Sequence, residues 1–320
     1  MRYRNLGASG CKVSTLALGS WLTLGGTVGQ RTTDALVRQA FDAGINFFDT
    51  ADIYNRGEAE LALGKALSPL RRQDIVLATK AFWPMSDNVN DKGLSRKHLM
   101  ESCESSLRRL STEYIDLYQC HRFDPETPVD ETARAMEDLI RQGKVLYWGV
   151  SVWTSPQIRA ACERAEHWGG FRPVTNQPQY SLLERGIEAD VIGTCRELGM
   201  SQIVWSPLAQ GLLTGKYAGG VVPKGSRAAD ERNNKFLLPL LNPQNLQRAA
   251  HLAAVARECG LTSAQLALAW VLRRPEIASA LVGATSSAQL EENLKAADVD
   301  VPPEVFTRLE AGAAVAVSAG

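Results

Sequence analysis

Short apolar runs alternate with longer amphipathic stretches along most of this 320-residue chain. Runs such as INFFD, DIVLATK and YIDLYQC are apolar almost throughout, which is typical of parallel strands that helices cover on both faces. A regular alternation of this kind predicts an α/β fold. The predicted strands are residues 16–18, 46–49, 75–79, 115–120, 145–150, 175–177, 202–205 and 280–282.

Helical patterns fill the intervals between these strands. Ser95 and Ser155 each precede a helical run and are predicted to cap it. Because helices separate the eight predicted strands without a linker-like change of composition, we expect one (β/α)8 TIM barrel domain over residues 1–320. A doubly wound open sheet is the alternative. The predicted helices are residues 33–43, 59–67, 95–110, 129–141, 155–168, 187–198 and 287–297.

Two regions depart from the simple alternation. A long segment rich in Gly, Lys and Arg runs from Pro207 to Pro239, and connections of this length usually have a function. Two helices in succession, at 243–259 and 263–273, follow it, one more than a minimal barrel needs. The small apolar residues at 310–320 carry no turn or cap signal, so we expect a flexible tail there.

Composition argues against several classes of partner. Lys+Arg and Asp+Glu both number 35, so no excess of basic residues indicates nucleic acid binding. The longest apolar runs fall short of the roughly 18 residues that a spanning helix needs, and the first residues lack a signal-peptide pattern. The six cysteines include no C-x-x-C pair, which favours reduced thiols. We therefore expect a cytoplasmic protein without a membrane segment.

Titratable side chains follow three consecutive predicted strands. The strands end at or just before Asp49, Lys80 and His121, and Tyr54 lies five residues after Asp49. In a barrel, side chains at the carboxyl ends of the strands meet around one mouth. Each residue alone is also consistent with a loop ion pair or a packing role, but the four together predict an active site.

This set suits the reduction of a carbonyl group. Hydride addition places negative charge on the carbonyl oxygen, which then needs a proton or a hydrogen-bond donor. A phenol is a weak acid near neutrality, and a neighbouring ammonium such as Lys80 makes Tyr54 a better proton donor. Asp49 would hold Lys80 in place, and His121 would orient the carbonyl oxygen or relay the proton.

The chain resembles the aldo-keto reductase superfamily over nearly its whole length, through six motifs in order: YRNLGASGCKVSTLALGSW, FDAGINFFDTADIY, GLSRKHLMES, DPETPVDETARAM, WSPLAQGLLTGKY and LVGATSSAQLEENL. It is most similar to the branch of the voltage-gated potassium channel β-subunits and their bacterial reductase relatives. The resemblance implies a barrel with an N-terminal β-hairpin and extra helices after the seventh strand and at the C-terminus. It also implies a catalytic tetrad of Asp49, Tyr54, Lys80 and His121. The channel subunits carry asparagine at the histidine position, so His121 favours the reductases.

The resemblance further implies NADPH, bound in extended form across the barrel mouth. The sequence agrees, since neither a Rossmann glycine fingerprint nor a Tyr-x-x-x-Lys pair is present. Val152 stands where the family usually has asparagine or arginine, which removes one polar cofactor contact and bears on affinity. Gln289 stands where many members have arginine, so NADH is an open alternative. The implied cofactor residues are Gly19, Ser20, Trp21, Asp49, Ser151, Gln177, Trp205, Ser206, Pro207, Leu208, Gly211, Lys216, Arg227, Gly283, Thr285, Gln289, Glu292 and Asn293.

The sequence thus predicts an NADPH-dependent reductase of small aldehydes or ketones, with homo-oligomers compatible with the resemblance. Aromatic residues after early strands predict a substrate pocket that suits apolar carbonyls. The alternative is a nucleotide-binding regulatory subunit with slow turnover, like the channel β-subunits. A metal hydrolase is disfavoured because the four histidines have no ligand spacing. The predicted pocket residues are Trp21, Tyr54, Phe82, Trp83 and His121.

Overall fold

A computed structural model describes residues 1–315 of the protein. Eight parallel strands close into a barrel in the order β10-β3-β4-β5-β6-β7-β8-β9. The closed barrel confirms the predicted (β/α)8 fold, and the open-sheet alternative is wrong. The strands are β3 (Leu16–Gly19), β4 (Phe47–Asp49), β5 (Val76–Ala81), β6 (Ile115–Cys120), β7 (Val145–Val150), β8 (Thr175–Asn176), β9 (Ser201–Val204) and β10 (Ile277–Val282).

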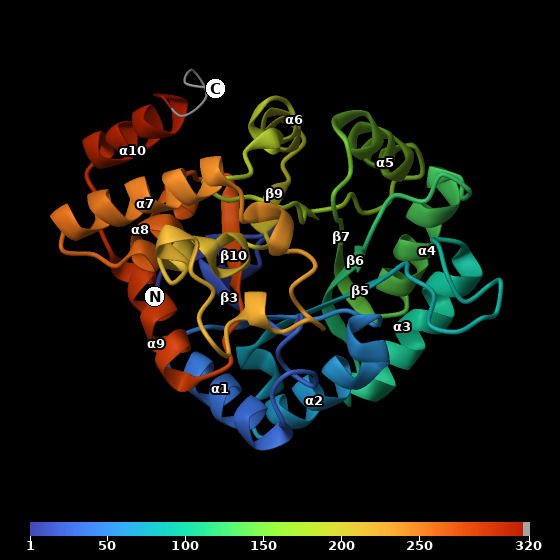
Figure 1. Ribbon diagram of the computed structural model, residues 1–320. Coiled ribbons are helices and arrows are strands. Elements are labelled where there is room, and N and C mark those ends of the chain that lie inside the picture. Colours follow the sequence, from blue (N-terminus) through green and yellow to red (C-terminus); the bar gives the residue numbers. More distant parts are fainter. Residues whose placement is uncertain (316–320) are drawn as a thin grey trace.

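Helices form a ring around this barrel (Figure 1). Ser95 caps its helix as predicted by accepting a hydrogen bond from His98 N. The prediction for Ser155 is wrong by one residue, because Thr154 occupies the N-cap and the Ser155 hydroxyl bonds to Asp190. The helices of the ring are α1 (Gln30–Asp42), α2 (Glu58–Leu67), α3 (Arg96–Leu110), α4 (Val129–Arg141), α5 (Ser155–His167), α6 (Val191–Glu197) and α9 (Ser287–Lys295).

An antiparallel hairpin of β1 (Tyr3–Asn5) and β2 (Lys12–Ser14) precedes the barrel. Leu6 and Val13 of this hairpin are fully buried, and they pack in one cluster with barrel residues that include Phe47 and Leu117. Burial of this apolar surface holds the hairpin against one end of the barrel. The other end, at the carboxyl ends of the strands, carries the site described below.

Two helices follow β9 as predicted, α7 (Pro243–Glu258) and α8 (Ser263–Leu272). A further helix, α10 (Pro303–Val315), follows α9. Residues 310–315, which were expected to belong to a flexible tail, are the last turns of α10, and residues 316–320 lie outside the described part. Within residues 1–315, no helix is both long and apolar enough to cross a membrane.

The long segment between β9 and α7 consists of short 3-10 helices joined by loops. It contains η4 (Ala209–Thr214), η5 (Ala218–Gly220), η6 (Arg227–Ala229) and η7 (Leu238–Leu240). Several of its residues have positive φ, among them Ser206, Gln210 and Gly211. Figure 1 shows this yellow-to-orange segment in front of the barrel strands.

Alternation along β5 decides which side chains enter the barrel. Val76 and Ala78 belong to the inner cluster, whereas Leu77 belongs to the outer core between strands and helices. Because side chains of a strand alternate between its two faces, Lys80 points into the barrel and Thr79 points outward. Their partners agree, since Lys80 contacts Asp49 and Thr79 contacts Glu60 on α2.

Candidate active site

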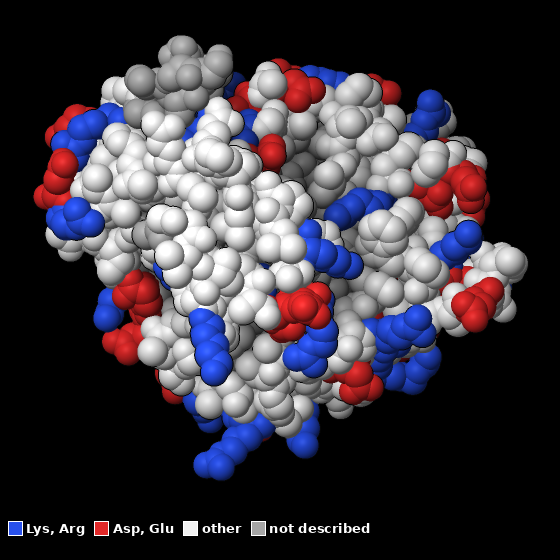
Figure 2. Space-filling model, in the orientation of Figure 1, with Lys and Arg blue, Asp and Glu red and all other residues white. Residues whose placement is uncertain are grey.

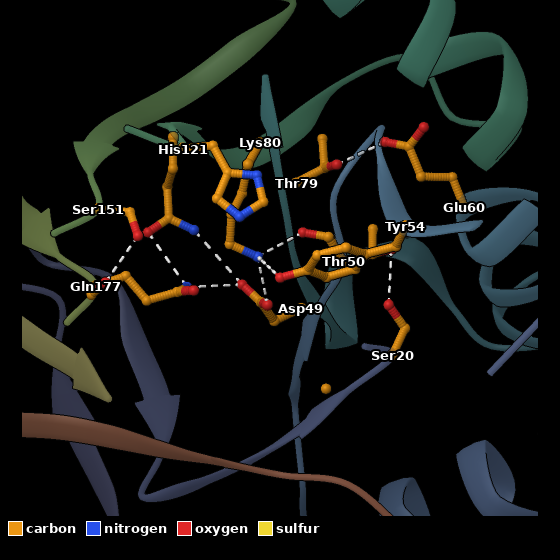
Figure 3. Close-up of polar contacts among 12 residues, drawn as sticks. Ser20, Asp49, Thr50, Tyr54, Glu60, Thr79, Lys80, His121, Ser151 and Gln177 are labelled. Carbon is orange, nitrogen blue, oxygen red and sulfur yellow. Dashed lines mark hydrogen bonds and ion pairs between the residues drawn. The ribbon is translucent and has the colours of Figure 1, made fainter. Parts of the chain in front are cut away.

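The four predicted catalytic residues come together at the carboxyl end of the barrel (Figure 3). Asp49 is the last residue of β4, Lys80 lies near the end of β5, and His121 directly follows β6. Tyr54 begins η1 (Tyr54–Gly57), the turn between β4 and α2. Side chains from three neighbouring strands and one loop therefore converge on one point.

A buried ion pair forms the floor of the site. Lys80 Nζ lies 2.6 Å from Asp49 Oδ1, and the two side chains are 0% and 2% exposed. The same ammonium donates to the Thr50 carbonyl at 2.7 Å and lies 3.5 Å from the Tyr54 hydroxyl. Burial acts to lower the pKa of Lys80, but Asp49 and Tyr54 outweigh it and raise the pKa. Lys80 is therefore a charged group fixed beside the phenol.

Tyr54 holds its proton in this environment. Burial raises the pKa of the phenol, Lys80 acts against that rise, and Asp49 adds to it. Lys80 thus acts in the expected direction, yet burial determines the net shift. The phenol is protonated at neutral pH, and the ammonium beside it stabilises the phenolate once the proton leaves.

His121 contributes a neutral ring to the wall of the site. Its ring centroid lies 5.7 Å from that of Tyr54, in an edge-to-face arrangement at 78°. Burial, Lys80 and Arg122 together place the pKa of His121 well below its usual value. Its Nδ1 is buried without a hydrogen-bond partner among the described residues. A neutral imidazole can donate a hydrogen bond to a carbonyl oxygen.

Two amide side chains, that of Gln177 directly after β8 and that of Gln119 on β6, support the ion pair. Gln177 Nε2 donates to Asp49 Oδ2 at 2.9 Å, and Gln119 Nε2 lies 3.5 Å from the same oxygen. Ser151 Oγ donates to the Gln177 carbonyl at 2.8 Å, which joins the ends of β7 and β8. The sequence analysis missed Gln119. Its position two residues before His121 on one strand was the available signal, since both then share a face.

Aromatic side chains form a continuous wall beside His121. The Phe82 and Trp83 ring centroids are 5.0 Å apart, and Trp83 lies 6.3 Å from His121. Trp21 instead packs against Phe236 of the long segment, with ring centroids 5.2 Å apart. The contact between Phe236 and Trp21 was not predicted, because nothing in the sequence pattern indicated that these two residues are close in space.

The residues after β9 include two cations without acidic partners. In the described part of the chain, no carboxylate forms an ion pair with Lys216 or Arg227. Burial lowers the pKa of Arg227, and its guanidinium donates to Gln210, whose amide donates to Ser206. A Cβ on Gly211, which has φ 95°, would lie 3.0 Å from Lys216 Nζ. Cations held this way suit phosphate oxygens, and Gln210 was missed by the sequence analysis.

The remaining predicted cofactor residues lie at the ends of β3, β9 and β10 and on α9. Gln289 Oε1 accepts hydrogen bonds from Thr285 N at 2.9 Å and Thr285 Oγ1 at 3.0 Å. Asn293 is buried, and Glu292 is engaged by the Thr262 hydroxyl of the α8 N-cap. Ser20 Oγ donates to Thr50 Oγ1 at 2.8 Å. The other members are Gly19, Trp205, Pro207, Leu208 and Gly283, and Val152 follows Ser151 with φ 59°.

The face that carries the carboxyl ends of the strands is hollowed near its middle. Figure 2 shows basic side chains, together with an acidic group, bordering this hollow. The rim of the hollow is therefore mixed in charge, and its basic side chains are the groups that an anionic ligand can contact.

Comparison with known proteins gives the same family throughout. The model of the aldo/keto reductase family matches residues 15–313. Proteins of Oryza sativa subsp. japonica and Arabidopsis thaliana, both named "Probable voltage-gated potassium channel subunit beta", are each 42% identical and cover 97% of this chain and 96% of their own length. A Schizosaccharomyces pombe protein, named "Putative voltage-gated potassium channel subunit beta", is 39% identical and covers 96% and 92%. Because the family model spans most of the chain and these relatives align over almost their whole length, the protein belongs to the aldo/keto reductase family.

Proposed function

We propose that the protein reduces aldehydes or ketones to alcohols with NADPH, and that Tyr54 gives the proton. Within the aldo/keto reductase family this assignment rests on the tetrad of Asp49, Tyr54, Lys80 and His121. The single observation that carries it is the buried Lys80 ammonium, 2.6 Å from Asp49 and 3.5 Å from the Tyr54 hydroxyl.

NADPH, when bound, supplies the hydride that the carbonyl carbon accepts. Lys216 and Arg227 would hold its phosphates, and Ser151 and Gln177 its carboxamide. The Tyr54 hydroxyl gives its proton to the carbonyl oxygen as the C–O double bond becomes an alcohol. Lys80 stabilises the phenolate that remains, which solvent then protonates. His121 is neutral, and it orients the carbonyl oxygen by donating a hydrogen bond to it.

The Tyr54→Phe variant tests the proposal. Removing the proton donor should lower kcat with 4-nitrobenzaldehyde by about 10²- to 10⁴-fold, measured as NADPH oxidation. NADPH affinity, measured by fluorescence titration, should change much less, because residues other than Tyr54 are proposed to hold the phosphates of NADPH. Tyr114→Phe, which removes a phenol outside the site, is the matched control. Unchanged turnover in Tyr54→Phe would remove Tyr54 from the acid role.

The names of the relatives favour a second candidate, a pyridine-nucleotide-binding regulatory subunit with slow turnover. This candidate predicts tight NADPH binding with negligible oxidation across many carbonyls. The same two assays separate the candidates, since the wild-type protein either turns over or only binds. A neutral His121 in van der Waals range of Tyr54 supports the reductase.

A further inference from the structure

Arg122 lies at the rim of the active site, directly after His121. Its guanidinium carbon lies 5.8 Å from the Trp83 ring centroid. Nη1 donates to the His121 carbonyl at 2.5 Å and lies 3.4 Å from Ser151 Oγ. Its charge acts on the pKa of both Tyr54 and His121. Arg122 therefore faces the reacting groups, although the sequence analysis did not single it out.

This guanidinium lacks an anion. Three other arginines that are largely buried meet a carboxylate: Arg72 meets Asp116, Arg109 meets Glu60, and Arg273 meets Glu310, all at 2.6 Å. Arg122 forms no ion pair with any described carboxylate, and burial lowers its pKa. A partly desolvated cation without a counterion is costly, which indicates that an anion of the ligand completes it.

The side of the guanidinium that an anion needs is accessible. Both hydrogen bonds that Arg122 makes to described residues use Nη1. Nε and Nη2 have no hydrogen-bond partner among the described residues, and neither atom is fully buried. Two parallel N–H groups match the two oxygens of a carboxylate.

We propose that the carbonyl substrates of this protein carry a carboxylate, which Arg122 binds while Tyr54 protonates the carbonyl oxygen. This inference rests on the proposed reductase function and adds the substrate class to it. One guanidinium suits a monoanion, because Lys80 is already paired with Asp49 and His121 is neutral. Trp83 lies beside both Arg122 and His121 and packs against Phe82, so an apolar spacer such as a short chain or one aromatic ring suits this wall.

The kinetic test compares 4-carboxybenzaldehyde with its neutral methyl ester, methyl 4-formylbenzoate. The wild-type protein should prefer the carboxylate by about 10-fold or more in kcat/KM, as a charge-assisted hydrogen bond allows. Arg122→Gln should lower that preference about 10- to 100-fold. Arg122→Lys keeps the charge but loses the two parallel N–H groups, so its preference should lie between those of the wild-type protein and Arg122→Gln. Arg141→Gln, an exposed arginine of α4, is the control for net charge and should keep the preference.

A binding measurement separates this inference from the proposed function. Calorimetry should detect 4-(hydroxymethyl)benzoate binding to the wild-type protein and much weaker binding to Arg122→Gln. If neither aldehyde is reduced but this difference persists, the reductase assignment fails and the carboxylate site stands. A wild-type protein that prefers the ester, or variants that weaken both substrates equally, would overturn the carboxylate site even if reduction is observed.

Discussion

Thr79 and Lys80 are neighbours on β5, yet their side chains enter two different polar clusters on opposite sides of the barrel wall (Figure 3). The inner cluster joins Lys80 to Asp49 and Tyr54. The outer cluster, between the barrel and helices α2 and α3, joins Thr79 to Glu60 at 2.5 Å. Both clusters bury charge, so burial alone does not identify the active site.

The difference lies in what each cluster leaves unpaired. Both oxygens of Glu60 are occupied, one by Thr79 and the other by Arg109 at 2.6 Å. The inner cluster instead has the Tyr54 hydroxyl, the neutral His121 and the Arg122 fork along one aromatic wall. Unused donors at a barrel mouth can act on a ligand, whereas a saturated carboxylate such as Glu60 behind the wall can only stabilise the fold.

Breaking the ion pair on each side gives the largest predicted contrast. Lys80→Met removes the charge that stabilises the Tyr54 phenolate, so kcat should fall by about 10³-fold. It also leaves Asp49 buried without its cation, at a cost of about 3–5 kcal/mol in the free energy of unfolding. Glu60→Gln should destabilise the protein by about 1–3 kcal/mol and leave kcat near the wild-type value. NADPH oxidation and urea denaturation measure the two effects.

Because both variants are destabilised, the folded fraction of each variant must be measured as a control for this comparison. Kinetics should be measured well below each melting temperature, with circular dichroism on the same sample. A Glu60→Gln protein that folds fully but loses as much turnover as Lys80→Met would show that the outer cluster belongs to the catalytic machinery.

Asp52, a carboxyl near Glu60 in the outer cluster, has a raised pKa, whereas His121 in the inner cluster has a lowered one. Asp52 is 0% exposed, its carboxyl accepts from Ser102 at 2.9 Å and from Ile53 N, and it forms no ion pair with a cation among the described residues. Burial, with Glu60 adding to it, raises the pKa of Asp52 from 3.8 to about 7. Between these values the folded state binds more protons than the unfolded state. The contribution of Asp52 to stability therefore falls as pH rises from about 4 to 7, by up to about 1.4 kcal/mol per pH unit.

Asp52→Asn should remove this slope. Its free energy of unfolding relative to the wild-type protein should increase as pH rises from 5 to 8, as measured by urea denaturation at several pH values. Asp34→Asn, on the exposed face of α1, is the matched control and should run parallel to the wild-type protein. Parallel curves for Asp52→Asn as well would place the Asp52 titration outside this window.

The sequence was sufficient for the barrel and for the meeting of Asp49, Tyr54, Lys80 and His121 at its mouth, because both depend on local patterns. Apolar runs between helical segments located all eight strands to within a few residues, and titratable residues at strand ends located Asp49, Lys80 and His121. Contacts between segments that are far apart in the sequence could not be predicted from local patterns. Phe236 against Trp21 and the saturation of Glu60 by Arg109 depend on how loops and helices pack. The outer cluster was missed because its residues have no common spacing.

Thr79→Val has a small predicted effect on turnover and is the sharpest test of the wall between the clusters. Valine keeps the branched shape of threonine and suits a strand, so the variant removes only the hydroxyl that donates to Glu60. Losing a hydrogen bond to a buried charged acceptor should cost about 1.5–3 kcal/mol in the free energy of unfolding. Turnover should stay within about 3-fold of the wild-type value, because Lys80 keeps its contacts on the inner face. If kcat falls more than about 10-fold while the melting temperature is unchanged, the hydroxyl of Thr79 affects the inner cluster across the barrel wall, and the two clusters are coupled.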